Sequence, residues 1–330
     1  MSALPTAPPQ LDRNLALELV RVTEAAAMAA AAHAGRGDKE RVDQAAVDAM
    51  RPALGSIAMD GVVVIGEGEK DEAPMLYNGE RVGAGGEPLV DVAVDPVDGT
   101  TLTAKNLPDA IAVIALSERG TMFDPGPCVY MEKLVVGRDA ADAVDLDAPI
   151  EANLAQIARA KGRRTRDLTV AVLDRPRHQE LIGRILATGA RIKYLIDGDV
   201  AAAIAAAREE SSVDVLVGIG GTPEGVIAAC ALKCLDGEIF GRLRPRDETE
   251  RAAAIDAGHD VDRVLETSDL VSGEDVFFAA TGVTDGELLR GVRLRPPYVA
   301  TSSLSMRSLS GAVREINARH HSTRSNLIVA

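Results

Sequence analysis

Apolar residues recur every three to four positions near the start of the chain, and this spacing predicts two helices. The first is expected over residues 14–33, where alanine-rich sequence continues an apolar face until the glycines of GRGDK interrupt it. The second is expected over residues 40–54, with apolar residues four, seven and eleven positions after Asp43. The Asp43 carboxyl group is therefore predicted to lie on the apolar face of its helix.

Four runs of aliphatic residues follow and predict strands at residues 62–65, 90–94, 110–116 and 131–136, before a helix at residues 149–161. The first two runs each end in acidic residues, within the sequences GEGE and DPVDGT. A Gly-rich, charged stretch separates these two runs. This arrangement predicts an α+β lobe built on a mixed sheet.

Strands and helices alternate regularly from about residue 167. Strands are expected at residues 168–173, 191–196 and 213–217, and helices at residues 178–187, 200–208 and 224–235. Such alternation predicts parallel βαβ units, whose functional loops lie at the carboxyl ends of the strands. Here those loops read DRPRH, DGD and GIGGTPEG.

The length of 330 residues exceeds what one hydrophobic core supports, since single cores stop growing near about 250–300 residues. We therefore expect an α/β fold in two lobes, of which the first is α+β. A Pro-rich, flexible leader is expected at residues 1–11. A metal-binding catalytic lobe would follow at residues 12–165, and a substrate-binding α/β lobe with a C-terminal segment at residues 166–330.

Composition excludes several classes of partner. The formal charge of −14 disfavours binding to DNA or anionic lipid, and the 2% of aromatic residues leaves few platforms for stacking nucleic-acid bases. No run approaches the about 18–20 apolar residues that span a bilayer. Three cysteines are too few for a disulfide framework, and Cys230 and Cys234 have the spacing of core residues on a helix. These features predict a cytoplasmic protein that binds neither nucleic acid nor membrane.

Acidic residues collect at the ends of the first two strands and on the second helix, at Asp43, Glu67, Glu69, Asp95 and Asp98. Two carboxylates about 5 Å apart repel by roughly 3 kcal/mol at an effective dielectric near 20, so such a group requires bound cations. Mg²⁺ or Mn²⁺ suits an oxygen-rich site without clustered His or Cys. A solvated acidic loop at GEGEKDE and a helix-edge charge at Asp43 remain open alternatives.

The sequence DPVDGT combines three features of a phosphate-binding metal site in six residues. Asp95 and Asp98 offer metal ligands, Pro96 stiffens the turn, and Gly99 lets the backbone approach a phosphate closely. Thr100 adds a hydroxyl group beside the metal. This combination predicts metal-assisted hydrolysis of a phosphate monoester. Because Asp, Pro and Gly are also common turn residues, an ordinary turn is the alternative.

The strand-end loops of the second lobe carry the candidate substrate contacts. Arg175 and Arg177 could clamp a second phosphate, which would make the substrate a bisphosphate. Asp197 and Asp199 could accept hydrogen bonds from sugar hydroxyls, and Glu224 follows a Gly-rich helix entry. Surface charges, a helix cap and a simple helix-entry turn are the respective alternatives.

Seven motifs occur in one order along nearly the whole chain: GRGDK, VIGEGEKDEAPMLY, VDPVDGT, YMEKLVVG, RPRH, DGDVAA and GIGGTPEGV. Together they resemble class II fructose-1,6-bisphosphatase, within the lithium-sensitive inositol-phosphatase superfamily. The resemblance implies a layered α-β-α-β-α sandwich of the sugar-phosphatase type. It also implies hydrolysis of the 1-phosphate of fructose 1,6-bisphosphate to fructose 6-phosphate, a gluconeogenic step, in a homo-oligomer such as a dimer or tetramer.

The resemblance also implies roles for individual residues. Two or more Mg²⁺ or Mn²⁺ ions per subunit would be held by Asp43, Glu67, Asp95, Asp98 and Glu224. Thr100 would orient the attacking water, with Asp71 as a helper base and Lys39 as an electrostatic stabiliser. Substrate contacts would come from Asp98, Gly99, Thr100, Tyr130, Arg175, Arg177, Asp197, Asp199 and Gly221.

Two departures leave the order of substrate preference open, because relatives can carry Glu at the position of Asp98 and Lys at that of Arg175. Sedoheptulose 1,7-bisphosphate is an alternative substrate, and an inositol or nucleotide monophosphate phosphatase is a rival enzyme with the same metal cradle. The alternative that is not an enzyme is a catalytically silent protein that senses sugar phosphate or metal.

Overall fold

The computed structural model describes residues 15–67 and 76–321. Its first layer consists of α1 (Leu15–Ala31) and α2 (Lys39–Gly55), so both N-terminal helices predicted from apolar spacing are confirmed. The Asp38 carboxylate accepts a hydrogen bond from the Arg41 backbone N–H at 2.9 Å and caps the start of α2. The predicted leader at residues 1–11 lies outside the described residues.

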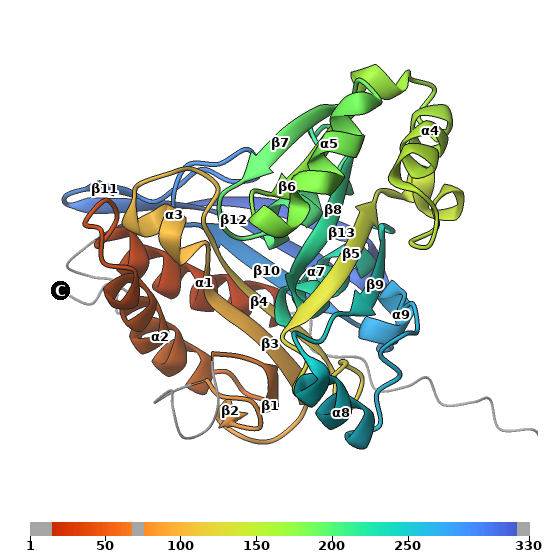
Figure 1. The fold of residues 1–330 in the computed structure, drawn as a ribbon. Helices are drawn as coiled ribbons and strands as arrows, with labels where there is room; N and C mark the ends of the chain where they lie inside the picture. The colour runs from red at the N-terminus through yellow and green to blue at the C-terminus, as the bar shows by residue number, and fades with distance from the viewer. Residues whose placement is uncertain (1–14, 68–75, 322–330) are drawn as a thin grey trace, which may run out of the picture.

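A mixed eight-stranded sheet covers one face of these helices (Figure 1). Its order is β11-β12-β10-β4-β3-β1-β2, with β13 paired to β12; β1 and β3 are parallel and the other neighbours antiparallel. The strands are β1 (Asp60–Ile65), β2 (Arg81–Val82), β3 (Leu89–Asp98), β4 (Ile111–Glu118), β10 (Phe277–Gly282), β11 (Arg293–Arg295), β12 (Tyr298–Arg307) and β13 (Ala312–His321). The short helix α3 (Thr100–Ala104) follows β3 directly.

A five-stranded sheet forms the second β layer, in the order β7-β6-β8-β5-β9. Its strands are β5 (Tyr130–Val136), β6 (Thr169–Leu173), β7 (Arg191–Leu195), β8 (Val215–Gly221) and β9 (Glu238–Leu243). The neighbours β7, β6 and β8 are parallel, which confirms the predicted βαβ units, whereas β5 and β9 join antiparallel. The carboxyl ends of the parallel strands face one common edge.

The other helices fill the remaining two layers and complete an α-β-α-β-α sandwich, as expected. They are α4 (Ile150–Ala160), α5 (Gln179–Ala187), α6 (Val200–Ala206), α7 (Thr222–Lys233), α8 (Glu248–Asp256) and α9 (Thr267–Leu270). α6 and α7 lie in the core between the two sheets, while α4 and α5 cover the outer face of the five-stranded sheet. Within residues 15–67 and 76–321, no helix has the length and apolar character needed to cross a membrane.

Alanine and small aliphatic residues make the middle layer thin enough to fit between two sheets. α7 is buried on almost every side, as expected of a helix that is apolar all round. Its residue Cys230, the following Cys234 and the distant Cys128 are free and buried. Burial raises the pKa of the Cys230 thiol to about 12. The interpretation of Cys230 and Cys234 as core residues is confirmed.

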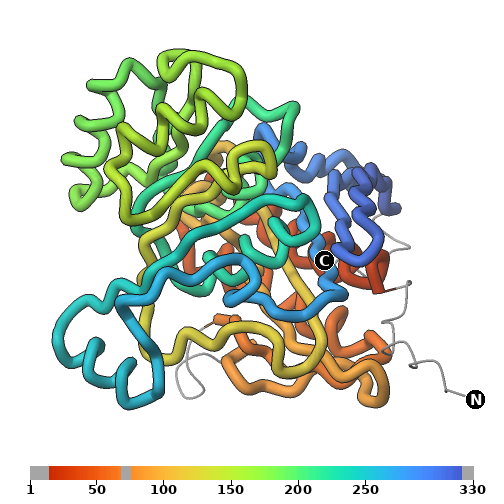
Figure 2. Tube along the Cα trace, turned by 90° about the vertical axis from the view of Figure 1, so that its right-hand side faces the viewer, coloured from red at the N-terminus to blue at the C-terminus, as the bar shows by residue number. Residues whose placement is uncertain are grey.

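Neither sheet is confined to one side of the predicted lobe boundary at residue 165. β5 lies before this residue but pairs with β8 and β9, and β10 lies after it but pairs with β4. The chain therefore crosses between the layers twice, and its last strands return beside the N-terminal helices (Figure 2). Where a boundary between lobes should be drawn stays a prediction.

β10 shows how the few aromatic residues are used. Phe277 packs into the core beneath α1 and α2, and the adjacent Phe278 packs into the core around α7, because successive side chains of a strand point to opposite faces. Both rings are almost fully buried. Each therefore anchors a different pair of layers.

We expect Phe278→Ala to lower the free energy of unfolding by about 3–5 kcal/mol, because it leaves a cavity in the core between the sheets. Leu17→Ala, at a side chain that is 57% exposed on α1, should change it by less than about 0.5 kcal/mol. Urea denaturation followed by circular dichroism measures both. Equal effects would show that the ring does not join the layers.

Candidate active site

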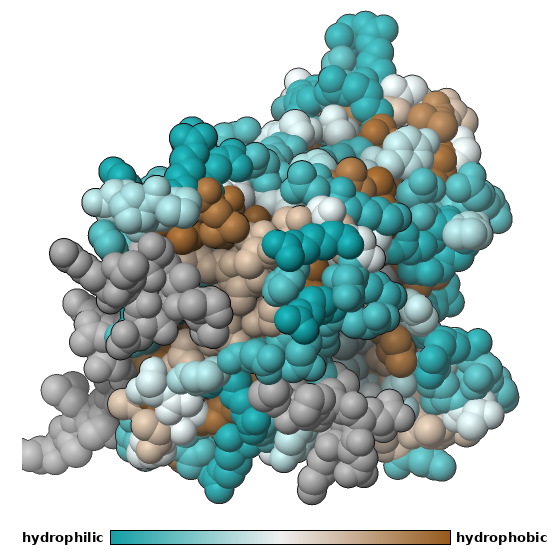
Figure 3. Space-filling model, turned by 90° about the vertical axis from the view of Figure 1, so that its left-hand side faces the viewer, coloured by the Kyte–Doolittle hydropathy of each residue, from teal (hydrophilic) through white to brown (hydrophobic). Residues whose placement is uncertain are grey.

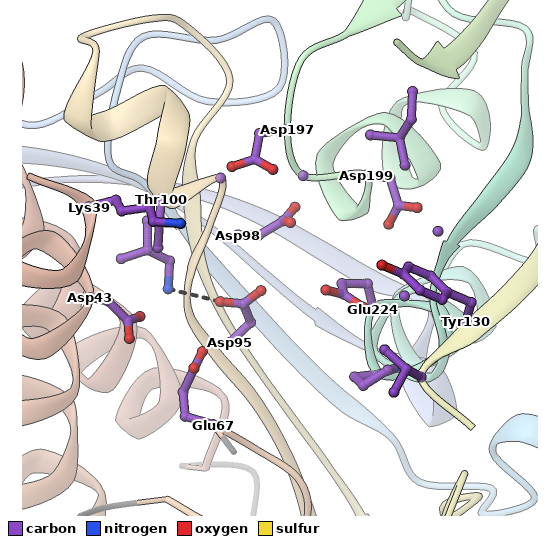
Figure 4. A pocket seen from close by; sticks show the side chains of 18 of the residues that line it. Lys39, Asp43, Glu67, Asp95, Asp98, Thr100, Tyr130, Asp197, Asp199 and Glu224 are labelled. Atoms are coloured by element: carbon purple, nitrogen blue, oxygen red, sulfur yellow. Dashed lines mark hydrogen bonds between the residues drawn. The ribbon is translucent and has the colours of Figure 1, made fainter. Parts of the chain in front are cut away.

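One cavity of about 560 Å³ opens where the ends of the two sheets meet (Figure 4). Every predicted site residue that the structure describes lines this cavity: Lys39, Asp43, Glu67, Asp95, Asp98, Gly99, Thr100, Tyr130, Arg175, Arg177, Asp197, Asp199, Gly221 and Glu224. Asp71, the predicted helper base, and the nearby Glu69 lie outside the described residues. The structure thus brings together residues separated by up to about half of the chain, while their roles stay predictions.

The bulged end of β3 carries both aspartates of DPVDGT, and both line the cavity. Asp95 pairs with Val113 of β4 and Asp98 pairs with Ile111, so β3 holds one extra residue between them. This bulge matters because residues three apart on a regular strand would point to opposite faces. Asp95–Asp98 are therefore a bulged strand end and not the ordinary turn of the alternative, and the bulge places two carboxylates on the same wall.

Gly99 is required by the geometry of the turn that joins β3 to α3. Its φ of 96° lies in the left-handed region, and a Cβ atom there would lie 2.9 Å from Leu102 Cδ1. Just before this turn, the Asp95 carboxylate accepts a hydrogen bond from the Val97 backbone N–H at 3.0 Å, within the bulge of β3 (Figure 4). α3 begins immediately afterwards, so the Thr100 side chain projects beside the two aspartates.

The carboxyl groups in the cavity raise one another's pKa. Burial, and then the neighbouring carboxylates, raise the pKa of Asp95 and Asp98 well above the usual value. The same causes raise the pKa of Glu67 to about 7, with contributions from Asp43 and Glu224. Burial also raises the pKa of Asp43 and of Glu224. Four separate segments of the chain therefore supply negative charge to one poorly solvated space.

The donor set of this wall fits a hard divalent cation. It consists of carboxylate oxygens, and the Glu224 Oε2 atom is buried without a hydrogen-bond partner. Among the described residues, no three acidic, His or Cys side chains already converge closely enough to hold an ion. Binding would therefore have to draw the carboxylates together, as expected for groups that otherwise repel.

Gly221 lets Glu224 reach the cavity. It precedes α7, and a Cβ atom on it would lie 1.8 Å from Glu224 Oε2. Glu224 lies in the first turn of α7, where the positive end of the helix dipole favours a carboxylate. The Gly-rich sequence thus forms the start of the helix, and its lack of a side chain at Gly221 leaves room for the Glu224 carboxylate.

Two arginines form the opposite wall of the cavity. Arg175 donates to the Ile196 carbonyl at 2.7 Å and lies 3.4 Å from the Asp197 carboxylate. Arg177 donates to the Ile219 carbonyl through Nε at 3.2 Å and Nη2 at 2.7 Å, and its guanidinium lies 5.1 Å from the Tyr130 ring centroid. Backbone carbonyls at the ends of β7 and β8 therefore hold both guanidinium groups.

His178 binds the backbone of Ile219, the same residue that Arg177 contacts. Its Nε2 accepts a hydrogen bond from the Ile219 backbone N–H, and its Nδ1 faces the Leu173 carbonyl, both at 2.7 Å. These contacts require a neutral ring with the proton on Nδ1. Burial lowers the pKa of His178, which favours that form. The ring thus holds the N–H group of Ile219, the residue whose carbonyl group binds Arg177.

Hydrogen bonds join the two walls directly. The Thr101 backbone N–H donates to Asp197, and the Val200 N–H donates to Asp98, both at 3.0 Å. Asp199 occupies the N-cap position of α6, but its side chain makes no capping hydrogen bond. It pairs instead with Lys133, and the helix-cap alternative is therefore wrong.

Sequence reasoning missed Lys133. The signal was a charged residue between Met131 and Val135, on the face of β5 that points into the core between the sheets. A lysine is almost never fully buried without a partner. Its position therefore predicts a buried acid, but the sequence does not indicate which one.

Comparison with known proteins places this geometry in a family. Residues 13–320 match the family model described as bacterial fructose-1,6-bisphosphatase, glpX-encoded. The class 2 fructose-1,6-bisphosphatase of Haemophilus influenzae is 45% identical over 326 residues, which cover 94% of this chain and 97% of that protein. Fructose-1,6-bisphosphatase 1 class 2 of Escherichia coli K12 is 42% identical over 327 residues, 95% and 97% of the two chains. The chain belongs to the class 2 fructose-1,6-bisphosphatase family.

Proposed function

We propose that this chain hydrolyses the 1-phosphate of fructose 1,6-bisphosphate, giving fructose 6-phosphate and inorganic phosphate, a step of gluconeogenesis. The observation that carries the proposal is one cavity with a carboxylate wall facing two held guanidinium groups. A substrate with a phosphate at each end fits these two unlike walls. The names of the relatives agree with that substrate.

The carboxylate wall would hold the reacting phosphate through Mg²⁺ or Mn²⁺. Asp43 and Glu67 would bind one ion, and Asp95, Asp98 and Glu224 another. When bound, such ions supply positive charge that stabilises the phosphoryl group during in-line attack by water. The bulge in β3 would orient Asp95 and Asp98 toward that phosphate, and the space left at Gly221 would do the same for Glu224.

Thr100 would position the attacking water through its hydroxyl group, since it begins α3 beside Asp95 and Asp98. Lys39, the first residue of α2, lines the cavity and would stabilise charge on the phosphate. The backbone at Gly99 allows close approach of the phosphate. The helper-base role of Asp71 stays a prediction.

The opposite wall would bind the rest of the substrate. Arg175 and Arg177 would bind the 6-phosphate, because guanidinium groups match phosphate oxygens in geometry and charge. Tyr130 lies beneath Arg177, and Asp197 and Asp199 would accept hydrogen bonds from sugar hydroxyls. Sedoheptulose 1,7-bisphosphate carries the same groups and is the alternative substrate.

A homo-oligomer, dimer or tetramer, and a cytoplasmic location also stay proposals. Figure 3 shows an apolar area on one face of the molecule, with hydrophilic surface above it, below it and to its right. Leu294 on β11 and Tyr298 on β12 are exposed, and β13 has no partner other than β12 within residues 15–67 and 76–321. Such surfaces are typical of contacts between subunits. Sedimentation velocity would measure the subunit number.

Phosphate release from fructose 1,6-bisphosphate, with inositol 1-phosphate in parallel, tests the function directly. We expect Thr100→Ala to lower kcat by about 100-fold, because the attacking water loses its hydrogen-bond partner. Thr101→Ala is the matched control, since Thr101 contacts Asp197 through its backbone N–H. If the wild-type protein released phosphate only from inositol 1-phosphate, it would be an inositol monophosphate phosphatase instead. If it released phosphate from neither substrate, the hypothesis of a catalytically silent sensor would be favoured.

Arg177→Met should raise KM for fructose 1,6-bisphosphate by about tenfold, because a charge-assisted contact to the second phosphate is lost. KM for a sugar monophosphate should change little. Arg184→Met, on α5 and paired with Glu151, removes the same charge away from the cavity and serves as control. Equal increases in KM for both substrates would contradict the clamp.

The raised pKa values predict how the metal-stripped protein responds to pH. A carboxyl group with a higher pKa in the folded state contributes stability that is lost as pH rises through that pKa. Glu67, raised from 4.5 to about 7, places this loss between about pH 5 and pH 8. We expect Tm to fall over this range and Mn²⁺ to raise Tm more at pH 8 than at pH 5. Glu67→Gln should flatten the fall; a Tm independent of both pH and Mn²⁺ would contradict the site.

A further inference from the structure

Lys133 is a buried cation beneath the substrate side of the cavity. Its side chain is 2% exposed and lies on β5 between Met131 and Val135, two residues of the core between the sheets. Placing an ammonium group in such a core is costly unless a carboxylate pairs with it. Neither the predicted metal ligands nor the predicted phosphate contacts include Lys133.

The partner of Lys133 is Asp199. The Lys133 Nζ atom lies 2.7 Å from Asp199 Oδ2 and 3.0 Å from Oδ1, so both carboxylate oxygens accept hydrogen bonds from the ammonium group. Asp199 also lines the cavity (Figure 4). A carboxylate has about four lone-pair sites, so this pairing leaves acceptor capacity for a ligand.

Glycine in β8 makes room for this ion pair. A Cβ atom on Gly220 would lie 2.2 Å from Asp199 Oδ2 and 3.0 Å from Lys133 Nζ. The φ angle of Gly220 is not in the left-handed region, so the backbone itself would accept alanine. A side chain at Gly220 would therefore occupy the space that the Asp199 carboxylate needs.

The pair also offsets charge where an anion must enter. An isolated carboxylate at Asp199 would repel a phosphorylated ligand, whereas the ammonium group of Lys133 cancels this charge from below. The adjacent residue Val200 donates its backbone N–H to Asp98 at 3.0 Å. The position of Asp199 is therefore fixed on one side by Lys133 and on the other through α6 and Asp98.

We propose that Lys133 is a positioning residue for the sugar: it holds the Asp199 carboxylate so that its free lone pairs accept hydrogen bonds from hydroxyl groups between the two phosphates. This inference rests on the proposed function. It assigns the Lys133–Asp199 pair to recognition of a polyhydroxylated carbon chain, separate from the contacts to either phosphate. Loss of the pair should weaken binding of sugar bisphosphate but not of inorganic phosphate, which has no sugar hydroxyls.

Gly220→Ala tests the proposal without changing any charge. Its methyl group should displace the carboxylate and raise KM for fructose 1,6-bisphosphate by about tenfold or more, with a smaller change in kcat. The inhibition constant of inorganic phosphate should stay at the wild-type value. Gly183→Ala on α5, where nothing lies within 4 Å of the added atom, is the matched control.

Lys133→Met removes the cation and should raise KM in the same way. Because a single substitution leaves a buried unpaired charge and could prevent folding, Asp199→Asn and the double variant Lys133→Met/Asp199→Asn are compared as well. If Lys133 acts through Asp199, the double variant should have the same KM as Asp199→Asn. A further tenfold increase in the double variant would overturn the proposal, as would a wild-type KM in Gly220→Ala.

Direct binding separates this inference from the proposed function. Calorimetric titration of fructose 1,6-bisphosphate into Thr100→Ala protein, with and without the Gly220→Ala change, measures affinity while turnover is slowed. Binding that weakens about tenfold with Gly220→Ala supports the positioning role, even if the wild type releases no phosphate and the proposed hydrolysis fails. Unchanged affinity, or no binding to the Thr100→Ala protein, would overturn the positioning role.

Discussion

Five carboxyl groups share a poorly solvated junction between two sheets, and their mutual repulsion is the constraint on which the arrangement of the site depends. The groups come from α2, the end of β1, the end of β3 and the start of α7. No one segment could present them all, so the fold has to bring four chain segments to one point. Because this costs folding free energy, the surrounding layers must be well packed.

The five layers meet this requirement by placing the charged groups on rigid elements. Asp95 and Asp98 lie on the eight-stranded sheet and the guanidinium wall on the five-stranded sheet, yet hydrogen bonds from Thr101 to Asp197 and from Val200 to Asp98 join them. The guanidinium wall is in turn held by backbone carbonyls, and His178 accepts a hydrogen bond from the N–H of Ile219, the residue whose carbonyl binds Arg177. The cavity is therefore preorganised on its substrate side, while the carboxylates still have to converge on a cation.

Local pattern was enough to predict most helices and strands of residues 14–235, because apolar spacing and strand-end loops depend on near neighbours. It did not predict the short elements β2 and α3. The acids and arginines that follow strands were also predictable, since the ends of those strands meet, whereas Lys39, Tyr130 and Gly221 were indicated only by the family resemblance. Sheet membership of β5 and β10 was not, because it depends on pairing between distant segments. The pairing of Lys133 with Asp199 was missed for the same reason, since one charge on a buried strand face does not indicate its partner.

The alanine-rich helix α7 has a consequence beyond packing. It lies between the two sheets and contacts both, so its girth sets the spacing of the layers. The same spacing separates the wall that would hold one phosphate from the wall that would hold the other. A bulkier side chain in this helix would spread the sheets and lengthen the gap at once. The packing of α7 therefore couples the separation of the sheets to the distance between the two walls of the cavity.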